Sequence, residues 1–556
     1  MTLHLRLTSS LEKMFHQKTI TDVKQLTVAS ILSNETFSFQ AQYFLPSQER
    51  KTRRTLSWSV ESELLPWLQL YQVTSVPGHL PCYNTVDEHY LTTEPGLFPD
   101  LLMPLTTPAL QITCNYQGAL WLCLTPPATG LPPGQHNITL CLQDKEDSSL
   151  VSESALTLTV LPDALPEQQL YHTEWIHTDC LANYYQLPVF SEEYWQAVRN
   201  FVQSAVAHGV NMMLTPLFTP PLDTAPGTVR TEVQLVDVAD DGQGGYRFGF
   251  ERLARWVSLC REEGIRDFEI AHFFTQWGAA HAPHVAVQLP DGSQEARFGW
   301  HTDAFGEQWR HFLTAFLPQL TAWFTQQGLQ DRVWFHISDE PTDQHLENYR
   351  KASDLLRPLI SGYRTLDALS DYDFYRLGLV EKPVTASDHL EPFLENQVPG
   401  QWTYYCCAQY QDVANRFMAQ PSVRNRILGV QLWLYRIEGF LHWGFNFYNS
   451  ELSREAIDPF AVTDGLQAFP AGDPFLVYPG KDFTPLPSIR LKVLLEALQD
   501  LRALQLLERL QGRAAVEALV DEMMGMRITF KVWPADAEKL LRLRHEVNRR
   551  IASNKA

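Results

Sequence analysis

The chain has 556 residues, of which 45% are hydrophobic and 12% aromatic, and it carries a formal net charge of −20. This length exceeds what one hydrophobic core normally supports, so about two or three domains are expected. The negative charge argues against nucleic acid and against an anionic membrane surface as partners, because like charges repel. It is compatible with an uncharged partner.

The N-terminus and the cysteines indicate where the protein resides. The first ten residues, M-T-L-H-L-R-L-T-S-S, lack the continuous apolar segment of a secretory signal, and no other stretch is apolar enough for membrane insertion. The eight cysteines show neither paired C-x-x-C spacing nor the density of a disulfide scaffold. We therefore expect a cytoplasmic protein with reduced thiols.

Up to residue 163 the sequence predicts an all-β domain, because short stretches of alternating apolar and polar residues are separated by Pro and Gly. The expected strands cover 37–43, 55–60, 111–114, 119–124, 137–141 and 155–161. This spacing favours a β-sandwich over residues 1–163, with a linker at 162–166.

From residue 167 to 487 strand-like runs alternate with amphipathic helical stretches, which is typical of a (β/α)8 TIM-like barrel with long loops. We expect strands at 170–175, 212–214, 267–270, 333–338, 363–366, 384–386, 402–405, 428–433 and 476–477. We expect helices at 192–207, 250–263, 308–327 and 346–359, and helical or irregular chain around 440–446. A doubly wound sheet is the alternative, but no G-x-G-x-x-G or phosphate-binding loop follows a predicted strand.

Residues 488–556 are predicted to be a helical C-terminal extension that packs on the barrel. Apolar residues recur at helical spacing in 491–510, 514–524 and 535–551. The basic residues of 542–550 are interleaved with apolar and acidic ones, which indicates a solvated helix face rather than a nucleic-acid site. The fold class is thus multidomain, all-β followed by α/β.

The segment 333–341, V-W-F-H-I-S-D-E-P, ends a predicted strand with two adjacent carboxylates. A period of two places His336 on the polar face and Phe335 on the apolar face that covering helices require. Pro341 favours an extended Glu340 and cannot donate to a ladder, so the strand should stop there. Catalytic side chains of β/α barrels lie at such strand ends, so Asp339 and Glu340 are the candidate catalytic residues.

Two neighbouring carboxylates cannot easily straddle a glycosidic bond, but they can act from one side when the sugar supplies its own nucleophile. In substrate-assisted hydrolysis this nucleophile is the carbonyl oxygen of a 2-acetamido group. Asp339 would orient the amide N–H and stabilise the developing positive charge, and Glu340 would act as general acid and then as general base.

The string W-F-H-I-S-D-E-P resembles the catalytic strand of glycoside hydrolase family 123 and of the related bacterial proteins grouped under domain of unknown function 4091. The later motifs 439–448 (G-F-L-H-W-G-F-N-F-Y), 458–460 (D-P-F), 471–480 (A-G-D-P-F-L-V-Y-P-G) and 487–491 (P-S-I-R-L) resemble the same family in the same order. The resemblance covers roughly residues 100–505. It implies a retaining, exo-acting β-N-acetylhexosaminidase of the β-N-acetylgalactosaminidase kind, with Asp339 and Glu340 as its acid pair.

Three polar residues near strand ends are candidates for substrate binding. Glu269 and His272 could bind sugar hydroxyls, although a structural hydrogen bond explains each equally well. His336 could orient Glu340 from the inward face, or it could fill the core.

Aromatic residues and one further acid complete the predicted substrate site. Trp433 and Trp443 flank a loop after a late strand, where a ring could stack on a pyranose, and core packing is the alternative. Only one of Tyr404 and Tyr405 should face the barrel interior, and Tyr405 is taken as the candidate. Asp473 could clamp a sugar hydroxyl or brace a turn.

No H-E-x-x-H, no G-x-S-x-G and no paired Cys or His spacing occurs, so neither a metal nor another cofactor is expected. The expected partner is a carbohydrate, an N-acetylhexosaminide, and the sequence makes no prediction of oligomeric state. One alternative is an ordinary retaining glycosidase with Glu269 or Asp367 as nucleophile, its carboxyl groups about 5 to 5.5 Å apart. Another is a barrel that binds carbohydrate without turnover.

Overall fold

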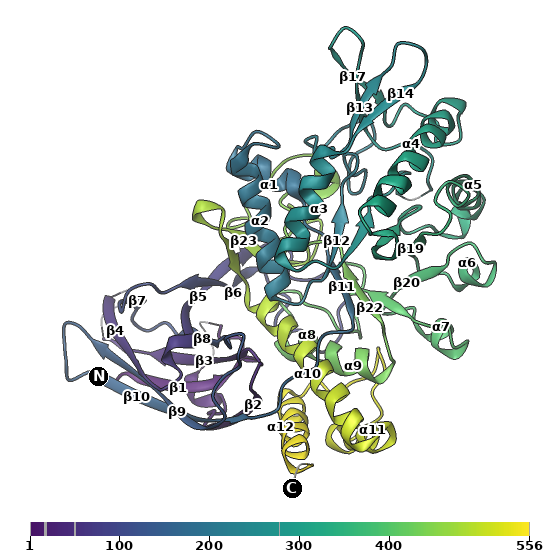
Figure 1. Cartoon of the computed structure of the whole chain (residues 1–556). Coiled ribbons are helices and arrows are strands. Elements are labelled where there is room, and N and C mark those ends of the chain that lie inside the picture. The colour runs from purple at the N-terminus through teal and green to yellow at the C-terminus, as the bar shows by residue number, and fades with distance from the viewer. Residues whose placement is uncertain (1, 16–18, 49–51, 277, 555–556) are drawn as a thin grey trace.

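The computed structural model describes residues 2–15, 19–48, 52–276 and 278–554 (Figure 1). It contains two five-stranded N-terminal sheets, a closed barrel of eight parallel strands with surrounding helices, and C-terminal helices. The prediction of a multidomain chain with an eight-stranded parallel barrel is confirmed. None of the described helices has the length and apolar character needed to cross a membrane.

The N-terminal sheets share one hydrophobic core. The first sheet, in spatial order, consists of β1 (His4–Ser9), β3 (Phe37–Phe44), β8 (Gly118–Leu124), β5 (Leu68–Gly78) and β6 (Gly96–Pro104). The second consists of β2 (Val28–Leu32), β10 (Val151–Leu161), β9 (Gly134–Asp144), β4 (Arg53–Glu61) and β7 (Leu110–Thr113). Alternate residues such as Leu120 and Leu122 of β8 and Leu140 and Leu142 of β9 are buried together, as a period of two requires.

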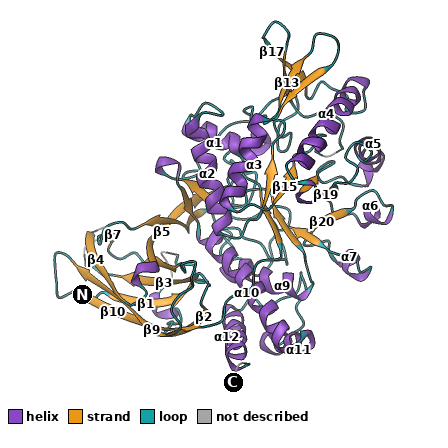
Figure 2. Ribbon diagram, viewed as in Figure 1, coloured by secondary structure: helices purple, strands orange, loops and turns teal. Residues whose placement is uncertain are grey.

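The barrel strands follow one another in sequence order around the closed sheet. They are β11 (Tyr171–Glu174), β12 (Met212–Thr215), β15 (Asp267–Ile270), β18 (Val333–Phe335), β19 (Arg364–Ala368), β20 (Lys382–Ala386), β21 (Trp402–Tyr404) and β22 (Gly439–His442). The helices between them are α1 (Thr178–Tyr185), α2 (Glu192–Ala207), α3 (Glu251–Glu263), α4 (Glu307–Gln326), α5 (Leu346–Leu356), α6 (Tyr372–Arg376), α7 (Glu391–Glu395), α8 (Ser422–Arg426) and α9 (Leu428–Leu434). These helices lie around the strands (Figure 2).

An aromatic layer fills the barrel near the amino ends of its strands. The ring of Trp402 lies 5.1 Å from Tyr171 and 5.3 Å from Trp334, measured between centroids. Gly439 leaves room for it, since a Cβ there would lie 2.0 Å from the Trp402 ring. Because this end is packed, the barrel can accept a substrate only at the carboxyl ends of its strands.

Two of the long loops at those carboxyl ends build a sheet of their own. The loops after β12 and β15 contribute β14 (Tyr246–Gly249), β13 (Asp237–Asp240), β16 (Val285–Gln288) and β17 (Gln294–Phe298), in that spatial order. This sheet projects from the top of the barrel in Figure 1. A separate hairpin is formed by β23 (Val477–Pro479) and β24 (Pro485–Pro487).

The chain ends in α10 (Ile489–Gln511), α11 (Arg513–Met524) and α12 (Ala537–Ser553). Ser488 caps α10, because its side chain accepts the N–H of Leu491. Helix α10 packs against α8 and α9, and α12 contacts β2 of the N-terminal sheets. The predicted division into 1–163, 167–487 and 488–556 stays a prediction.

The prediction for the last barrel strand is wrong. Residues 428–433 were expected to be a strand but belong to helix α9. The last barrel strand is β22, which overlaps the segment 440–446 that was expected to be helical or irregular. The predicted strand at 476–477 overlaps β23 only at Val477, and β23 belongs to the β23–β24 hairpin outside the barrel. All residues of α9 are buried, so it lacks the polar face by which a helix is recognised in sequence.

Gly429 permits the close packing of α9 on α10, so we expect Gly429→Ala to destabilise the protein. The added methyl group would lie 1.9 Å from the carbonyl oxygen of Ala497, and the helices must separate at a cost of about 1–3 kcal/mol or more. Thermal unfolding should show a clearly lower Tm. The control is Gly96→Ala, because no atom lies within 4 Å of the added carbon. Equal melting temperatures of the two variants would contradict the packing argument.

Candidate active site

Asp339 and Glu340 lie in a bend after β18, at the carboxyl end of the barrel. The strand ends at Phe335, earlier than predicted, and Glu340 has a left-handed backbone with φ of 42°. The expectation that Pro341 keeps Glu340 extended is therefore wrong. The N–H of Glu340 donates to the carbonyl of Ala368, 3.0 Å away, which holds the chain in this turn. Such a conformation costs about 1–3 kcal/mol and is concentrated at functional sites.

Glu340 is held by Tyr404, which ends β21. The Tyr404 hydroxyl donates to Glu340 Oε1 at 2.7 Å. Tyr405 points the other way, and its ring packs against Phe440 and His442. The choice of Tyr405 as the inward residue is therefore corrected to Tyr404, because the strand register presents one of two neighbours to the interior.

Asp339 is largely buried beside Glu340, with a side chain that is 15% exposed. Burial, followed by the negative charge of Glu340, raises the pKa of Asp339 well above its usual range. Two adjacent carboxyl groups repel each other when both are ionised, which favours a state in which one of them keeps its proton. An acid and a base can therefore be present together in the pair.

A charged network lies beneath the pair, in the middle of the barrel. Glu269 accepts hydrogen bonds from the Thr173 hydroxyl, from Trp175 Nε1 at 3.1 Å and from His336 Nε2 at 2.7 Å. His336 Nδ1 lies 3.4 Å from Asp367 Oδ1. Burial opposes a charge on His336, but the hydrogen bonds to Asp367 and Glu269 outweigh it and raise the pKa of His336 to about 9. His336 is thus an imidazolium at neutral pH.

His272 connects this network to the acid pair. Its ring stacks on His336 with centroids 4.2 Å apart, and its Nε2 lies 3.9 Å from Asp339 Oδ1. Burial, followed by the charge of His336, lowers the pKa of His272 well below its usual value, so this ring is neutral. Glu269 has no exposed surface and His272 is 2% exposed. The structure therefore places both beneath the mouth, where a sugar hydroxyl does not reach Glu269.

The donor atoms of His272, His336 and Asp367 lie within 4.8 Å of one another, a spacing that a metal ion could bridge. Metal binding requires deprotonated imidazole nitrogens. Both nitrogens of His336 face carboxylates that favour its protonated form. These three groups and Glu269 are connected by ion pairs and by the stacked histidine rings.

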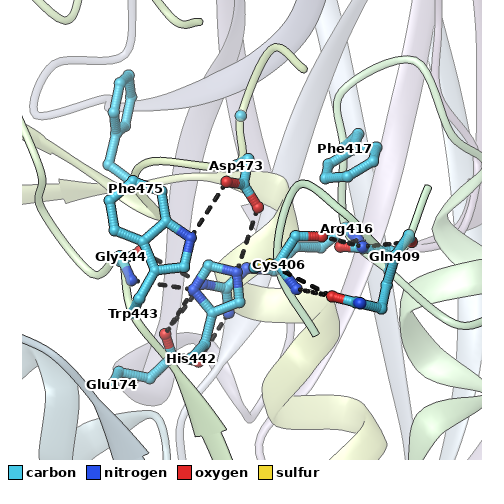
Figure 3. Close-up of polar contacts among 12 residues, drawn as sticks. Glu174, Cys406, Gln409, Arg416, Phe417, His442, Trp443, Gly444, Asp473 and Phe475 are labelled. Atoms are coloured by element: carbon cyan, nitrogen blue, oxygen red, sulfur yellow. Dashed lines mark hydrogen bonds and ion pairs between the residues drawn. The ribbon is translucent and has the colours of Figure 1, made fainter. Parts of the chain in front are cut away.

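A second cluster lies around the carboxyl end of β22, which is across the closed barrel from β18, and we call it the opposite wall of the mouth. Figure 3 shows its polar contacts. Asp473 Oδ2 accepts from Trp443 Nε1 at 3.2 Å, and Asp473 Oδ1 lies 3.5 Å from His442 Nε2. His442 Nδ1 accepts the N–H of Gly444, so its proton is on Nε2 and faces Asp473. Asp473 is fully buried. It braces the Trp443 indole, and its predicted contact with a sugar hydroxyl stays a prediction.

Glu174 anchors this cluster from below. Arg416 binds it with both terminal nitrogens, at 2.7 and 2.9 Å. Burial disfavours its charge, but the charge of Arg416, the hydrogen bonds from His172 and Arg416 and the neighbouring His442 together outweigh burial and lower the pKa of Glu174 to about 2. Trp443 is partly exposed and packs on the hydrophobic cluster that contains Tyr404 and Trp175. A flat aromatic wall therefore borders the mouth.

Trp433 does not contribute to the mouth, contrary to the prediction. It lies on α9 and is 2% exposed. Its Nε1 donates to Glu508, and the Arg513 guanidinium lies 3.9 Å from its ring centroid. The error follows from the assignment of this segment as a strand.

Sequence reasoning missed Glu174, Trp175, Arg416 and His442. Trp175 and Glu174 end a strand that was predicted, so their position at its carboxyl end was a usable signal. His442 was missed because β22 was not recognised. Arg416 lies between β21 and α8 without a pattern that marks it.

Comparisons with known proteins concern the family and the overall fold of the chain. The family model "Glycoside hydrolase 123, catalytic domain" matches residues 175–507. A solved family 123 glycoside hydrolase from Clostridium perfringens is similar in fold, with a TM-score of 0.75, 14% sequence identity, and coverage of 100% of this chain and 98% of that chain. A family 39 glycoside hydrolase from Bacteroides cellulosilyticus has a TM-score of 0.33 and 11% identity, with 85% of this chain and 81% of that chain covered. No curated protein sequence matches.

We expect Tyr404→Phe to lower kcat/KM about 10- to 100-fold, because it removes a hydrogen bond to a carboxyl group at the reacting centre. Tyr405→Phe is the matched control, since it removes the same atom from the neighbouring residue on the other side of the strand. Steady-state kinetics of both variants, with their Tm values, provide the test. Equal losses in the two variants would refute the assignment of Tyr404.

Proposed function

The chain belongs to glycoside hydrolase family 123, whose catalytic-domain model matches more than half of it, and we propose that it is a retaining, exo-acting β-N-acetylhexosaminidase. The chain is a glycoside hydrolase and its substrate is a carbohydrate. We further propose that the glycone is an N-acetylgalactosaminide and that its 2-acetamido group is the nucleophile. The observation that carries the proposal is the placement of two adjacent carboxyl groups on one turn at the barrel mouth.

In this mechanism the protein supplies protonation and orientation, and the substrate supplies the attacking atom. Glu340 protonates the glycosidic oxygen while the acetamido carbonyl oxygen attacks the anomeric carbon from the opposite face. Asp339 accepts the amide N–H and stabilises the positive charge of the oxazolinium-like intermediate. Water then opens this intermediate with Glu340 as base. Two inversions at the anomeric carbon retain its configuration.

The surroundings of the pair support these roles. Tyr404 binds Glu340 Oε1, and the proton that Glu340 transfers is then carried by Oε2. The partly exposed ring of Trp443, braced by Asp473, can stack on a pyranose face or wall the acetamido group.

The burial of the alternative nucleophiles favours substrate assistance over an ordinary retaining mechanism. Glu269 and Asp367 have no exposed surface, and both are bound to His336. A carboxylate must reach the anomeric carbon to act as nucleophile, and neither residue lines the open mouth.

We also propose that the two N-terminal sheets form a β-sandwich and that the barrel is of the (β/α)8 type. The shared core of the two sheets supports the first assignment, and the helices that separate consecutive barrel strands support the second.

We expect the enzyme to hydrolyse nitrophenyl N-acetyl-β-galactosaminide and to hydrolyse the corresponding β-galactoside at least about a thousandfold more slowly. The reason is that the acetamide acts intramolecularly, where effective molarities are high. The same assay with the gluco forms of both substrates measures the preference for the sugar separately from the dependence on the acetamide. Comparable rates with and without the acetamide would sink the proposed mechanism.

We expect the pH profile of kcat/KM to have an acid limb above the ordinary aspartate range of about 3.9, because Asp339 must be ionised and its pKa is raised. Activity should be lost as the pH falls through this limb. On the alkaline side activity should be lost as Glu340 deprotonates, and this limb should vanish in Glu340→Gln.

We expect Asp339→Asn to lower kcat about 10²- to 10³-fold without a large change in Tm, because it removes charge stabilisation and leaves the shape of the side chain. A normal rate in Asp339→Asn would contradict its role. A Tm far below that of the wild type would instead indicate a structural residue.

A further inference from the structure

We propose that His336 is a positioning residue with a buried positive charge. This charge acts on Asp339 across the stacked ring of His272. It favours the ionised form of Asp339 and the orientation of its carboxylate that binds the substrate. This inference rests on the proposed function, in which Asp339 must be an anion when it binds the substrate amide. His336 itself has no exposed surface and touches neither substrate nor the glycosidic bond.

The geometry fixes the charge of His336. Its two nitrogens point at two carboxylates from neighbouring barrel strands, Glu269 of β15 at 2.7 Å and Asp367 of β19 at 3.4 Å. An imidazole that faces an acceptor on both sides is satisfied only when both nitrogens carry a proton. Glu269 already accepts from Thr173 and Trp175, which favours its ionised form as the counter-ion.

The neutral ring of His272 lies between His336 and Asp339 of the acid pair. Its ring is parallel to that of His336 within 26°, and its Nε2 is the ring atom that approaches Asp339, at 3.9 Å. Both nitrogens of His272 are buried without a hydrogen-bond partner among the described residues. A small movement of Asp339 on substrate binding would close this gap to a hydrogen bond and satisfy one of them.

Several charged and titratable groups surround Asp339 and act together on its pKa. Glu340 raises the pKa of Asp339, His336 lowers it, and Asp367 raises it to a smaller extent than His336 lowers it. Tyr349 of α5 donates a hydrogen bond to Asp367, and Tyr404 of β21 donates one to Glu340. The attraction by His336 is thus the principal force that opposes protonation of Asp339.

The test separates the effect of the charge at position 336 from the effect of the shape of the side chain. We expect His336→Gln to move the acid limb of the kcat/KM profile upward by about one pH unit. At pH values on the acid side of the limb, kcat/KM should then fall about tenfold. At higher pH the decrease in kcat/KM should be smaller. His336→Lys keeps a positive charge and should return the limb toward the wild-type position. Thr173→Val is the control, because it removes a hydrogen bond to Glu269 without changing a charge, and its limb should not move.

A second measurement does not depend on activity. In wild-type protein with 13C-labelled histidine, one of the 18 histidines should keep the imidazolium chemical shift up to about pH 8. This signal should be absent in His336→Gln. A neutral His336 at pH 7 would overturn the proposal even if the substituted proteins do not fold.

The kinetic outcomes separate this proposal from the proposed function. An equal loss at every pH in His336→Gln and His336→Lys would show that His336 only fills space. If the wild type hydrolyses glycosides regardless of the acetamide, the proposed function fails, and the imidazolium signal still reports whether His336 carries its charge.

Discussion

Burial of charge in the middle of the barrel is the constraint on which the site depends. Glu269, His336 and Asp367 have no exposed surface, and an isolated ion in such a place costs several kcal/mol. The barrel offsets this cost by placing opposite charges and hydrogen-bond donors next to each other. The donors come from β11 and the residue after it, from the chain after β18 and from α5. They are Thr173, Trp175, the N–H of Ile337 and Tyr349. The closure of the barrel therefore determines the positions of the polar groups beneath the acid pair.

A buried ion pair connects the N-terminal sheets to the opposite wall of the mouth. Arg490 of α10 binds Asp100 of β6 through two nitrogens, at 2.8 and 3.0 Å. Its third nitrogen donates to the carbonyl of Gly472, the residue before Asp473. Asp473 in turn holds the indole of Trp443. The N-terminal sheets thus contribute to the site without lining it, and removal of Asp100 would leave a buried arginine unpaired next to the loop that positions the wall.

The sequence predicts elements well where one face is apolar and the other polar. Helix 192–207 and strand 267–270 agree with α2 and β15 because amphipathic and alternating patterns report local geometry. Helix α9 fails for the opposite reason, since a helix buried on all sides carries no such pattern. The choice between Tyr404 and Tyr405 fails because a register of one residue decides which side chain faces inward, and the sequence does not fix that register.

Asp339 and Glu340 can be proposed as the acid pair from sequence alone, but the different surroundings of their two carboxyl groups cannot be predicted from it. Adjacent carboxyl groups in one environment would compete for a proton as equals. The left-handed turn at Glu340 separates their surroundings, because it delivers Glu340 to Tyr404 and leaves Asp339 beside His272. These contacts involve residues that lie far apart in the chain and meet only when the barrel closes. The proposed acid pair is therefore visible in the local sequence, whereas the different surroundings of its two carboxyl groups are a property of the fold.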